Sequence, residues 1–436
     1  MNIKHINNSF FLIKSKATTF VCDPWIGEME NTGTWSFPNL DNDKKILNRI
    51  KPDYIYISHL HYDHFDKKIL KNYKLKKTKI IIKRFNDGRL KDNLIRLGYK
   101  NIIELNSWQS YTINDLEVTM VPCDSSNSAN ISTEINYDLD TSLIIFDKKN
   151  KVSFYNNVDN PLSLKAIKKV KKYVYKKYGK LDILSAGPRG ASEYPQCFLN
   201  INRVSEKKKI IQKCIKRVDE IIKILKPKYL IPAGGSYIIF GKFHKLQKYV
   251  AHPTIKELKK HYSKFKNLEF LNLDCGSSID ITHNKVLLNI VRNNKKFNKQ
   301  LNAKKYFYSK INDKKINLIE KFNEAKNNYF NKLEKLKVKN NWIINFHLYK
   351  NLKLFSNMKI NKQISLTNKF SLINDRYKKK SQVLNFYMDR KLFITLLTKK
   401  NFNWNLAIGG SIILMERYPN KFIPDVPFSL NFLRTW

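Results

Sequence analysis

Cysteine is scarce in this chain, and so are long apolar runs. The five cysteines are scattered and include no Cys-x-x-Cys pair: Cys22, Cys123, Cys197, Cys214 and Cys275. This distribution argues against a disulfide framework or a structural zinc ribbon and favours a reduced, cytoplasmic setting. No apolar stretch approaches the length of a membrane span, and the first residues do not resemble a signal peptide.

Acidic residues are also few, because 82 lysines and arginines stand against 36 aspartates and glutamates, giving a net charge of +46. Such a charge suggests nucleic-acid binding. The lysines are spread along the chain, however, and lysine, asparagine and isoleucine are abundant together. A solvated basic surface is therefore the preferred interpretation, with a nucleic-acid-processing or nucleic-acid-binding protein as an alternative. A diffuse positive field would also steer anionic substrates to the protein.

Histidine is rare too, with nine in 436 residues, yet three of them lie within six positions. The run His59-Leu60-His61-Tyr62-Asp63-His64 follows the apolar, β-rich stretch 54–57. Imidazole and carboxylate together suit zinc, iron or manganese. A loop at the end of a strand could direct His59 and His61 to one ion and Asp63 and His64 to a second.

The rest of the N-terminal part predicts two sheets covered by helices, because strands first gather in hairpins and then alternate with helices. Phe10–Ile13 and Thr18–Cys22 are predicted to form a hairpin. Further strands are expected at 54–57, 79–82, 101–105, 116–121, 142–147, 151–155, 181–186 and 229–232. Helices are expected at 44–50, 89–97, 163–178 and 206–225.

The composition changes after about residue 295, where 293–298 is a polar stretch and a plausible linker. Asp313–Leu336 is predicted to be a helix with Asp313 as its N-cap, and Val383–Asp389 and Lys391–Leu397 are predicted strands. The chain is therefore divided into a metal-binding catalytic domain, residues 1–292, and a smaller α+β C-terminal accessory unit, residues 300–436.

The His-x-His-x-Asp-His run resembles the signature of the metallo-β-lactamase superfamily. That resemblance implies an α/β fold of the αββα sandwich type, one or two divalent metal ions at the edge between its sheets, and mostly hydrolytic chemistry. It also implies that Asp159, at a strand end, bridges the metals, although Asp159 could be an ordinary turn residue. His244 resembles the last histidine ligand of the family, with His252 as its rival.

The chain departs from the superfamily pattern at one point, because no histidine lies between His64 and His244. The matching stretch is 121–126, where Asp124 could substitute as an oxygen ligand and Cys123 is a weaker candidate. In many members the aspartate matching Asp63 also orients the attacking water. The resemblance thus implies the ligand set His59, His61, Asp63, His64, Asp159, His244 and Asp124, with Asp63 as the catalytic residue.

Other segments resemble the catalytic portion of the CMP-N-acetylneuraminate hydroxylase group, over roughly residues 8–290. They are Asp23-Pro24-Trp25, 184–187, 193–198, 226–235 and 248–249. Members of that group also carry a Rieske iron–sulfur domain, which needs closely spaced cysteine and histidine pairs. No such pair occurs here. The chain is expected to hold no iron–sulfur cluster of its own.

These features predict a metal-dependent hydrolase acting on an anionic small molecule, such as a phosphorylated or nucleotide-linked sugar. Zinc is the first choice of metal, and iron is the alternative. The runner-up is the oxygenase component of a sugar-hydroxylating system that needs a separate electron-transfer protein. Bound iron would favour that second function.

Overall fold

A computed structural model describes most of the chain. The described residues are 1–29, 32–36, 49–73, 77–124, 140–273, 277–282, 285–289, 301–338, 342–354, 362–366, 382–400, 402–422 and 425–436. The predicted linker at 293–298, and all but the end of the predicted helix at 44–50, lie outside them. Among the described residues, no helix combines the length and the apolar character needed to cross a bilayer.

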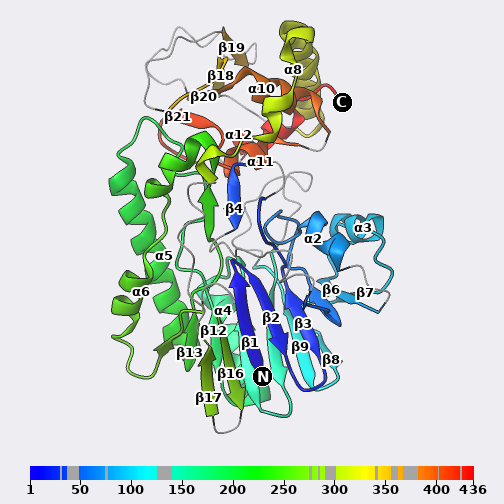
Figure 1. Cartoon of the computed structure of the whole chain (residues 1–436), viewed down its shortest axis with the longest axis vertical. Helices are drawn as coiled ribbons and strands as arrows, with labels where there is room; N and C mark the ends of the chain where they lie inside the picture. Colours follow the sequence, from blue (N-terminus) through cyan, green and yellow to red (C-terminus); the bar gives the residue numbers. More distant parts are fainter. Residues whose placement is uncertain are drawn as a thin grey trace.

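Two facing sheets form the lower part of the molecule (Figure 1). In the order of pairing, the first contains β17 (Lys285–Asn289), β16 (Ser278–Thr282), β1 (Asn2–Asn7), β2 (Phe10–Lys14), β3 (Thr19–Cys22), β5 (Tyr54–Tyr56), β6 (Lys79–Lys83) and β7 (Ile102–Leu105). The second contains β15 (Glu269–Phe270), β13 (Tyr229–Ile231), β12 (Ile183–Ser185), β11 (Val152–Asn156), β10 (Ser142–Asp147), β9 (Leu116–Val121) and β8 (Ser110–Ile113). The predicted hairpin is confirmed as β2 and β3, which pair antiparallel.

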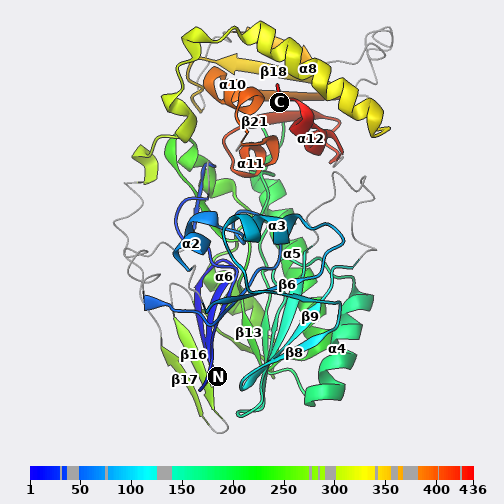
Figure 2. The same cartoon turned by 90° about the vertical axis from the view of Figure 1, so that its right-hand side faces the viewer.

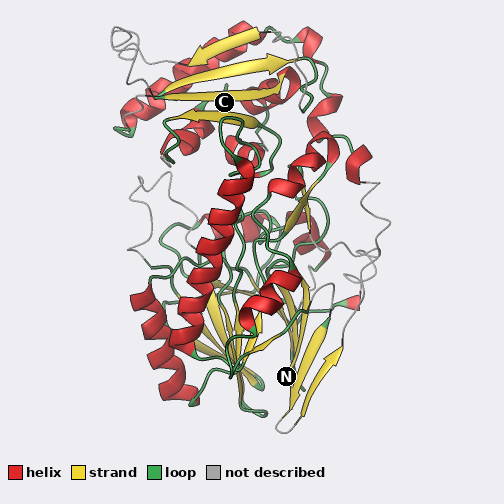
Figure 3. Ribbon diagram, turned by 90° about the vertical axis from the view of Figure 1, so that its left-hand side faces the viewer, coloured by secondary structure: helices red, strands yellow, loops and turns green. Residues whose placement is uncertain are grey.

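Side chains alternate between the two faces of each strand, so each sheet contributes to two apolar layers. Ile81 of β6 and Phe154 of β11 pack in the cluster between the sheets. Ile80 and Ile82 face the outer cluster beneath α2 (Lys67–Asn72) and α3 (Arg89–Arg96). Tyr155 faces the opposite outer cluster beneath α4 (Leu164–Tyr178), α5 (Arg203–Leu225) and α6 (Ile255–Tyr262). This layering confirms the predicted αββα sandwich, and Figure 3 shows the helices outside the strands.

The covering helices begin and end where capping chemistry places them. The Ser163 side chain accepts a hydrogen bond from the Ala166 amide at the start of α4, and Gly179 ends that helix at φ +79°. Asn202 caps α5 in the same way. Both helices place their apolar stripe against the outer face of the second sheet, so burial rather than propensity sets their position.

The C-terminal part forms a further sheet above the sandwich, with α8 (Leu318–Lys335) lying along it (Figure 2). Its strands pair in the order β19 (Lys362–Leu366), β18 (Ile343–Tyr349), β20 (Val383–Asp389) and β21 (Leu414–Tyr418). β20 confirms a predicted strand. The predicted helix at 313–336 is confirmed only from Leu318 onward, because Asn317 rather than Asp313 provides the N-cap of α8.

The predicted strand Lys391–Leu397 is wrong, since Arg390–Thr398 is the helix α10. The segment is a continuous apolar run, and such a run has no period that separates a buried strand from a buried helix. Its side chains from Leu392 to Leu397 are all buried, in contact with the apolar face of the C-terminal sheet. The tertiary environment therefore decides the conformation.

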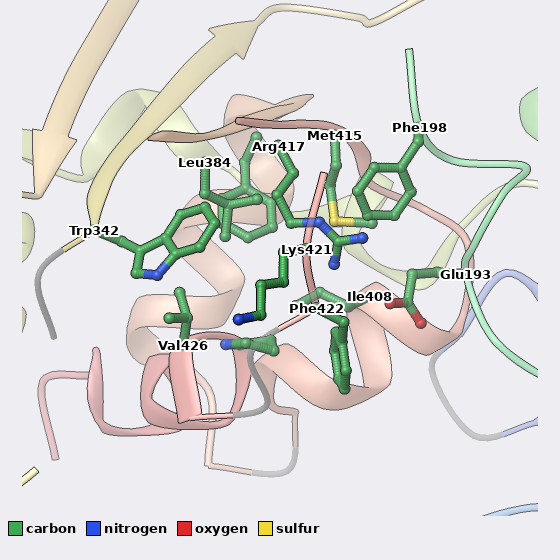
Figure 4. Close-up of a pocket in the computed structure, with 12 residues that line it drawn as sticks. Glu193, Phe198, Trp342, Leu384, Ile408, Met415, Arg417, Lys421, Phe422 and Val426 are labelled. Carbon is green, nitrogen blue, oxygen red and sulfur yellow. The ribbon is translucent and has the colours of Figure 1, made fainter. Parts of the chain in front are cut away.

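The C-terminal sheet shares its apolar cluster with the sandwich. Phe198 and Phe240, from the N-terminal part, pack in the same cluster as Phe386 and Trp404. The backbone of 197–199 pairs with Met415, through amide–carbonyl bonds of 2.8 Å in both directions. A small cavity lies at this junction, with Arg417 over the Phe198 ring at 4.8 Å and Glu193 on its rim (Figure 4). The domain boundary at 292–300 itself stays a prediction.

A polar contact also joins the two parts. The Asp389 carboxylate accepts hydrogen bonds from Lys242 Nζ at 2.6 Å, from the Tyr308 hydroxyl at 3.0 Å and from the Leu352 amide at 2.6 Å. Since Asp389 is 8% exposed, each of these donors would lose its partner without regaining full hydration if the carboxylate were removed.

We therefore expect Asp389→Ala to lower the free energy of unfolding by about 2–4 kcal/mol, because it removes the acceptor of the Tyr308 hydroxyl and the Leu352 amide and leaves Lys242 Nζ with Asn351 Oδ1 at 3.2 Å. Urea titration monitored by tryptophan fluorescence measures this loss. Asp313→Ala is the control, since Asp313 pairs with Arg390 at 3.4 Å in a partly exposed position. That change should cost less than about 1 kcal/mol. Equal losses in the two variants would contradict the assignment.

Candidate metal centre

The candidate site lies beyond the carboxyl ends of parallel strands in both sheets. In the first sheet β3 and β5 run parallel, so Asp23 and Ser58 leave at the same edge. In the second sheet β11, β12 and β13 are parallel, so Asp159 leaves at the same edge as the loops that begin at 186 and 232. Open α/β sheets usually bind ligands in this place, because several loops converge there.

The buried carboxylate of Asp23 organises the histidine loop. Its Oδ1 accepts the Ser58 amide at 2.8 Å, and its Oδ2 accepts the Ser58 hydroxyl at 2.7 Å and His64 Nδ1 at 2.9 Å. The single Ser58 hydroxyl proton is thus directed to Asp23, so Ser58 Oγ accepts from His59 Nδ1 at 2.9 Å. Both imidazoles therefore carry a proton on Nδ1 and direct Nε2 away from Asp23.

The two Nε2 atoms face acidic side chains. His59 Nε2 lies 2.7 Å from His61 Nδ1 and 3.3 Å from Asp140 Oδ1. His64 Nε2 lies 3.1 Å from Asp159 Oδ2. His59, His61 and Asp140 form one group whose possible ligand atoms all lie within 4.8 Å of one another, and His59, His64 and Asp159 form a second. His59 belongs to both groups, so the two candidate positions adjoin.

Asp63 lies next to the second group, with its Oδ2 3.5 Å from His64 Nε2. Asn8 holds this carboxylate by donating from Nδ2 to Oδ2 at 3.1 Å. Asn8 is itself fixed, because its Oδ1 accepts the Ser236 amide at 3.0 Å and its carbonyl accepts the Gly234 amide at 2.9 Å. A strained backbone position, φ +39°, lets Asn8 make these contacts, and asparagine tolerates that region better than most residues.

The electrostatics of the cluster favour a cation. Burial lowers the pKa of His64, but the carboxylates of Asp63, Asp23 and Asp159 together raise that pKa well above its ordinary value. Burial lowers the pKa of His59 well below its ordinary value, and the positive charges of His64 and His61 lower it further. The three carboxylates thus surround the buried imidazole of His64.

The pKa of Asp63 reflects the positive charge of the neighbouring imidazoles. Burial raises it, but the charge of His64 and the hydrogen bond from His64 bring it down to about 2. The carboxylate is thus ionised throughout the neutral range. A divalent cation would supply the positive charge that these carboxylates attract.

Five of the predicted ligands converge here, namely His59, His61, Asp63, His64 and Asp159. Asp124 and His244 belong to neither group among the described residues. The Asp124 carboxylate instead accepts the Ser163 amide at 3.0 Å, ahead of α4. His244 lies in the 3₁₀ segment Gly241–Tyr249, with Nδ1 2.7 Å from the Ile239 carbonyl oxygen.

The two weaker candidates lie in unfavourable surroundings. His252 is partly buried beside the Tyr237 ring, and burial of its imidazole together with the charge of Arg189 lowers the pKa of that group to about 3. Burial raises the pKa of the Cys123 thiol to about 11, and the carboxylates of Asp140 and Asp124 reinforce this shift. A thiol with that pKa is protonated at neutral pH and is a poor metal ligand.

Asp140 is the residue that the sequence argument missed. β9 and β10 pair antiparallel with Val121 opposite Ser142, so the chain leaving β9 and the chain entering β10 meet at the same edge. The backbone at Asp124 and at Asp140 therefore lies at the edge of the sheet that carries the site. An aspartate two residues before a strand is a signal that could have found it, but the pairing of the two strands is needed to use that signal.

We expect Asp23→Asn to weaken metal binding by about 10- to 100-fold, because it removes the charge and one acceptor that fix both imidazoles. Competition with a fluorescent chelator measures the affinity. Asp53→Asn is the matched control, since Asp53 is an exposed carboxylate at the opposite end of β5, where it accepts the Thr19 amide at 2.8 Å. An unchanged affinity in a folded Asp23→Asn variant would refute the organising role of Asp23.

The chain is similar to proteins of known sequence and structure. Residues 2–150 match the family model of the beta-lactamase superfamily domain. A Mycolicibacterium smegmatis protein, named as a candidate Rieske 2Fe-2S iron–sulfur protein, is 27% identical over 203 residues, which are 45% of this chain and 36% of the relative. A similarly named Mycobacterium tuberculosis protein is 25% identical over 203 residues. The chain spans only about a third of the length of these curated relatives, 36% in both cases.

Two solved structures are also similar. CmlA, a diiron β-hydroxylase from Streptomyces venezuelae, is 15% identical with a TM-score of 0.39, over 66% of this chain and 54% of that chain. An isothiocyanate hydrolase from Delia radicum gut bacteria is 12% identical with a TM-score of 0.42, over 65% and 100% of the two chains. The match of residues 2–150 to that family model and the two layered sheets agree on a metallo-β-lactamase type of fold.

Proposed function

We propose that the chain is a metal-dependent hydrolase that acts on an anionic small molecule. The observation that carries this proposal is the pair of imidazole Nε2 atoms, on His59 and His64, which the buried Asp23–Ser58 network directs toward Asp140 and Asp159. Histidine ligands of metals almost always donate their other ring nitrogen to a carboxylate or a similar acceptor. His59 and His64 have this arrangement, because Nδ1 of each donates to the Asp23–Ser58 network and Nε2 of each is left for a metal.

The donor set fits a divalent transition metal. His59, His61 and Asp140 would hold one ion, and His64 with Asp159 and Asp63 would hold a second. Mixed imidazole and carboxylate donors suit zinc, iron and manganese, whereas calcium and magnesium prefer oxygen alone. The missing middle histidine is replaced by Asp140 in this proposal, so both positions keep at least two protein ligands.

When bound, such ions act as Lewis acids and lower the pKa of water. The protein's own contribution is to place an ionised carboxylate beside that chemistry. Asp63 is held by Asn8 and stays ionised at neutral pH, so it can accept a hydrogen bond from the attacking water and orient it. The positive field of a chain with net charge +46 would raise the encounter rate with anionic substrates.

A second candidate function is the oxygenase component of a system with separate electron carriers. The observation that favours it is the match to mycobacterial relatives named as candidate Rieske proteins. The chain matches about a third of their length, and in this proposal the electrons come from separate carriers. A nucleic-acid function rests on the charge alone.

The deciding assay reconstitutes the purified chain with zinc, iron or manganese and tests a panel of phosphoesters and carboxylic esters. We expect metal-dependent hydrolysis that a chelator abolishes, that falls as salt rises because screening weakens steering, and that drops to the metal-free level in His61→Ala. His261→Ala is the control, because His261 pairs with Asp219 on the outer helices.

The same assay includes CMP-sialic acid in air, with and without an added reductase and ferredoxin. Hydroxylation that requires these carriers and bound iron, with no hydrolysis of any ester, would replace the first function by the second. Activity that is unchanged in the His61→Ala variant would contradict both.

A further inference from the structure

A cavity adjoins the candidate metal centre on the side of the second sheet. It encloses about 930 Å³ of empty space, counting the part that opens to solvent. Asp159 lines it, and the same carboxylate lies 3.1 Å from His64 Nε2. The cavity and the metal centre therefore share a wall, and a molecule in the cavity could extend to the candidate ligands.

Gly234 and Gly235 have no side chain to fill the space between the cavity and the candidate metal centre. Gly234 has φ +94°, and a Cβ there would lie 3.3 Å from Asp159 Oδ1. Gly235 has φ +65°, and its Cβ would lie 3.2 Å from the Cβ of Ala191. Side chains at these positions would be strained and would crowd the space beside Asp159. The backbone is thus shaped to leave room next to the carboxylate.

Among the residues that the structure describes, two arginines and no lysine line the cavity. Arg189 is anchored, because its Nη1 donates to the Pro232 carbonyl at 2.6 Å, and it brings a fixed positive charge to the cavity wall. Arg217 lies on α5, on the same face as the cavity-lining Ile221 one turn further on. The ion pair between Arg217 and Glu220 is weak, since Nη1 lies 3.9 Å from Oε2 and both side chains are about a third exposed.

The cavity lining also includes a polar amide, on Asn157. Tyr155 donates to Asn157 Oδ1 at 3.0 Å, which turns the donor end of the Asn157 amide to the other side. Guanidinium and amide donors together suit an oxyanion.

We propose that this cavity binds an anionic group of the substrate, a phosphate or a carboxylate, with Arg217 as its recognition residue and Arg189 as a fixed supporting charge. The proposal rests on the proposed function, because it assigns the substrate side of the same centre. An anion held here would leave the adjoining part of the substrate beside Asp159. Val218 and Ile221 give the cavity an apolar side, which would cover the uncharged body of the molecule.

The test compares Arg217→Gln with Lys216→Gln in the full-length, metal-loaded protein. Both variants lose one positive charge on α5, but Lys216 is exposed and does not line the cavity. Calorimetry with inorganic phosphate should show affinity roughly 10- to 100-fold weaker in Arg217→Gln, the usual effect of losing a charged hydrogen-bond donor, and unchanged in Lys216→Gln. Metal content should be the same in all three proteins.

Two further arms separate the possible explanations. Chelator-treated protein should keep an Arg217-dependent phosphate site, whereas phosphate that binds only to metal would vanish and would overturn the proposal. Acetate and succinate, tested beside phosphate and sulfate, distinguish a carboxylate group from a phosphate group as the ligand. Arg217→Lys, which keeps the charge, should retain part of the affinity and guards against a folding defect.

Turnover data would keep this proposal distinct from the proposed function. With an active substrate, Arg217→Gln should raise KM and leave kcat nearly unchanged. Arg217-dependent phosphate binding without any hydrolysis would leave the anion site standing and sink the hydrolase. If hydrolysis and phosphate binding were the same in Arg217→Gln and in the wild type, the hydrolase would stand and the anion site would be refuted.

Discussion

The candidate metal centre depends on one buried carboxylate. Asp23 is fully buried, and burial raises the pKa of its carboxyl, while the charge of His64 and the hydrogen bonds from His64 and Ser58 oppose this rise. Because it accepts from Ser58 and His64, it fixes the proton on Nδ1 of both His64 and, through the Ser58 hydroxyl, His59. Without that network each imidazole could rotate or change tautomer, and the two Nε2 atoms would no longer face the carboxylates.

The fold explains why a carboxylate can occupy this position. Asp23 has φ +42°, and it ends β3 at the edge where β5 delivers the histidine loop. Sheet pairing fixes the distance between the two strands, so the network is rigid. The facing sheet brings Asp159 from β11 to the same edge, and the apolar layer between the sheets sets its approach to His64. The site is therefore a property of the sandwich rather than of the loop alone.

The C-terminal sheet continues this packing rather than forming a separate body. Its apolar cluster includes Phe198 and Phe240. These two residues lie in the segments that follow the loops lining the cavity beside Asp159. Lys242 and Asp389 add a charged contact across the same junction. The C-terminal unit therefore packs against the segments that follow the loops at 186–191 and 232–235.

The sequence predicts those elements that depend on neighbouring residues alone. The histidine run, the hairpin at 10–22 and the helices at 163–178 and 206–225 depend on spacing, periodicity and caps, and the structure contains them. Asp23, Asn8 and Asp140 could not be assigned from the sequence, because each acts through a partner at least 35 residues away. Lys391–Leu397 was assigned to the wrong class, since a short apolar run has no diagnostic period and its environment decides.

The central claim is that Asp140, rather than Asp124, completes the centre started by the histidine loop. Elemental analysis of metal-reconstituted wild type, Asp140→Asn and Asp124→Asn tests it most directly, with anomalous scattering to place the ions. The account predicts that Asp140→Asn loses one metal position, and that Asp124→Asn keeps the wild-type content. Loss of metal in Asp124→Asn with full content in Asp140→Asn would contradict it.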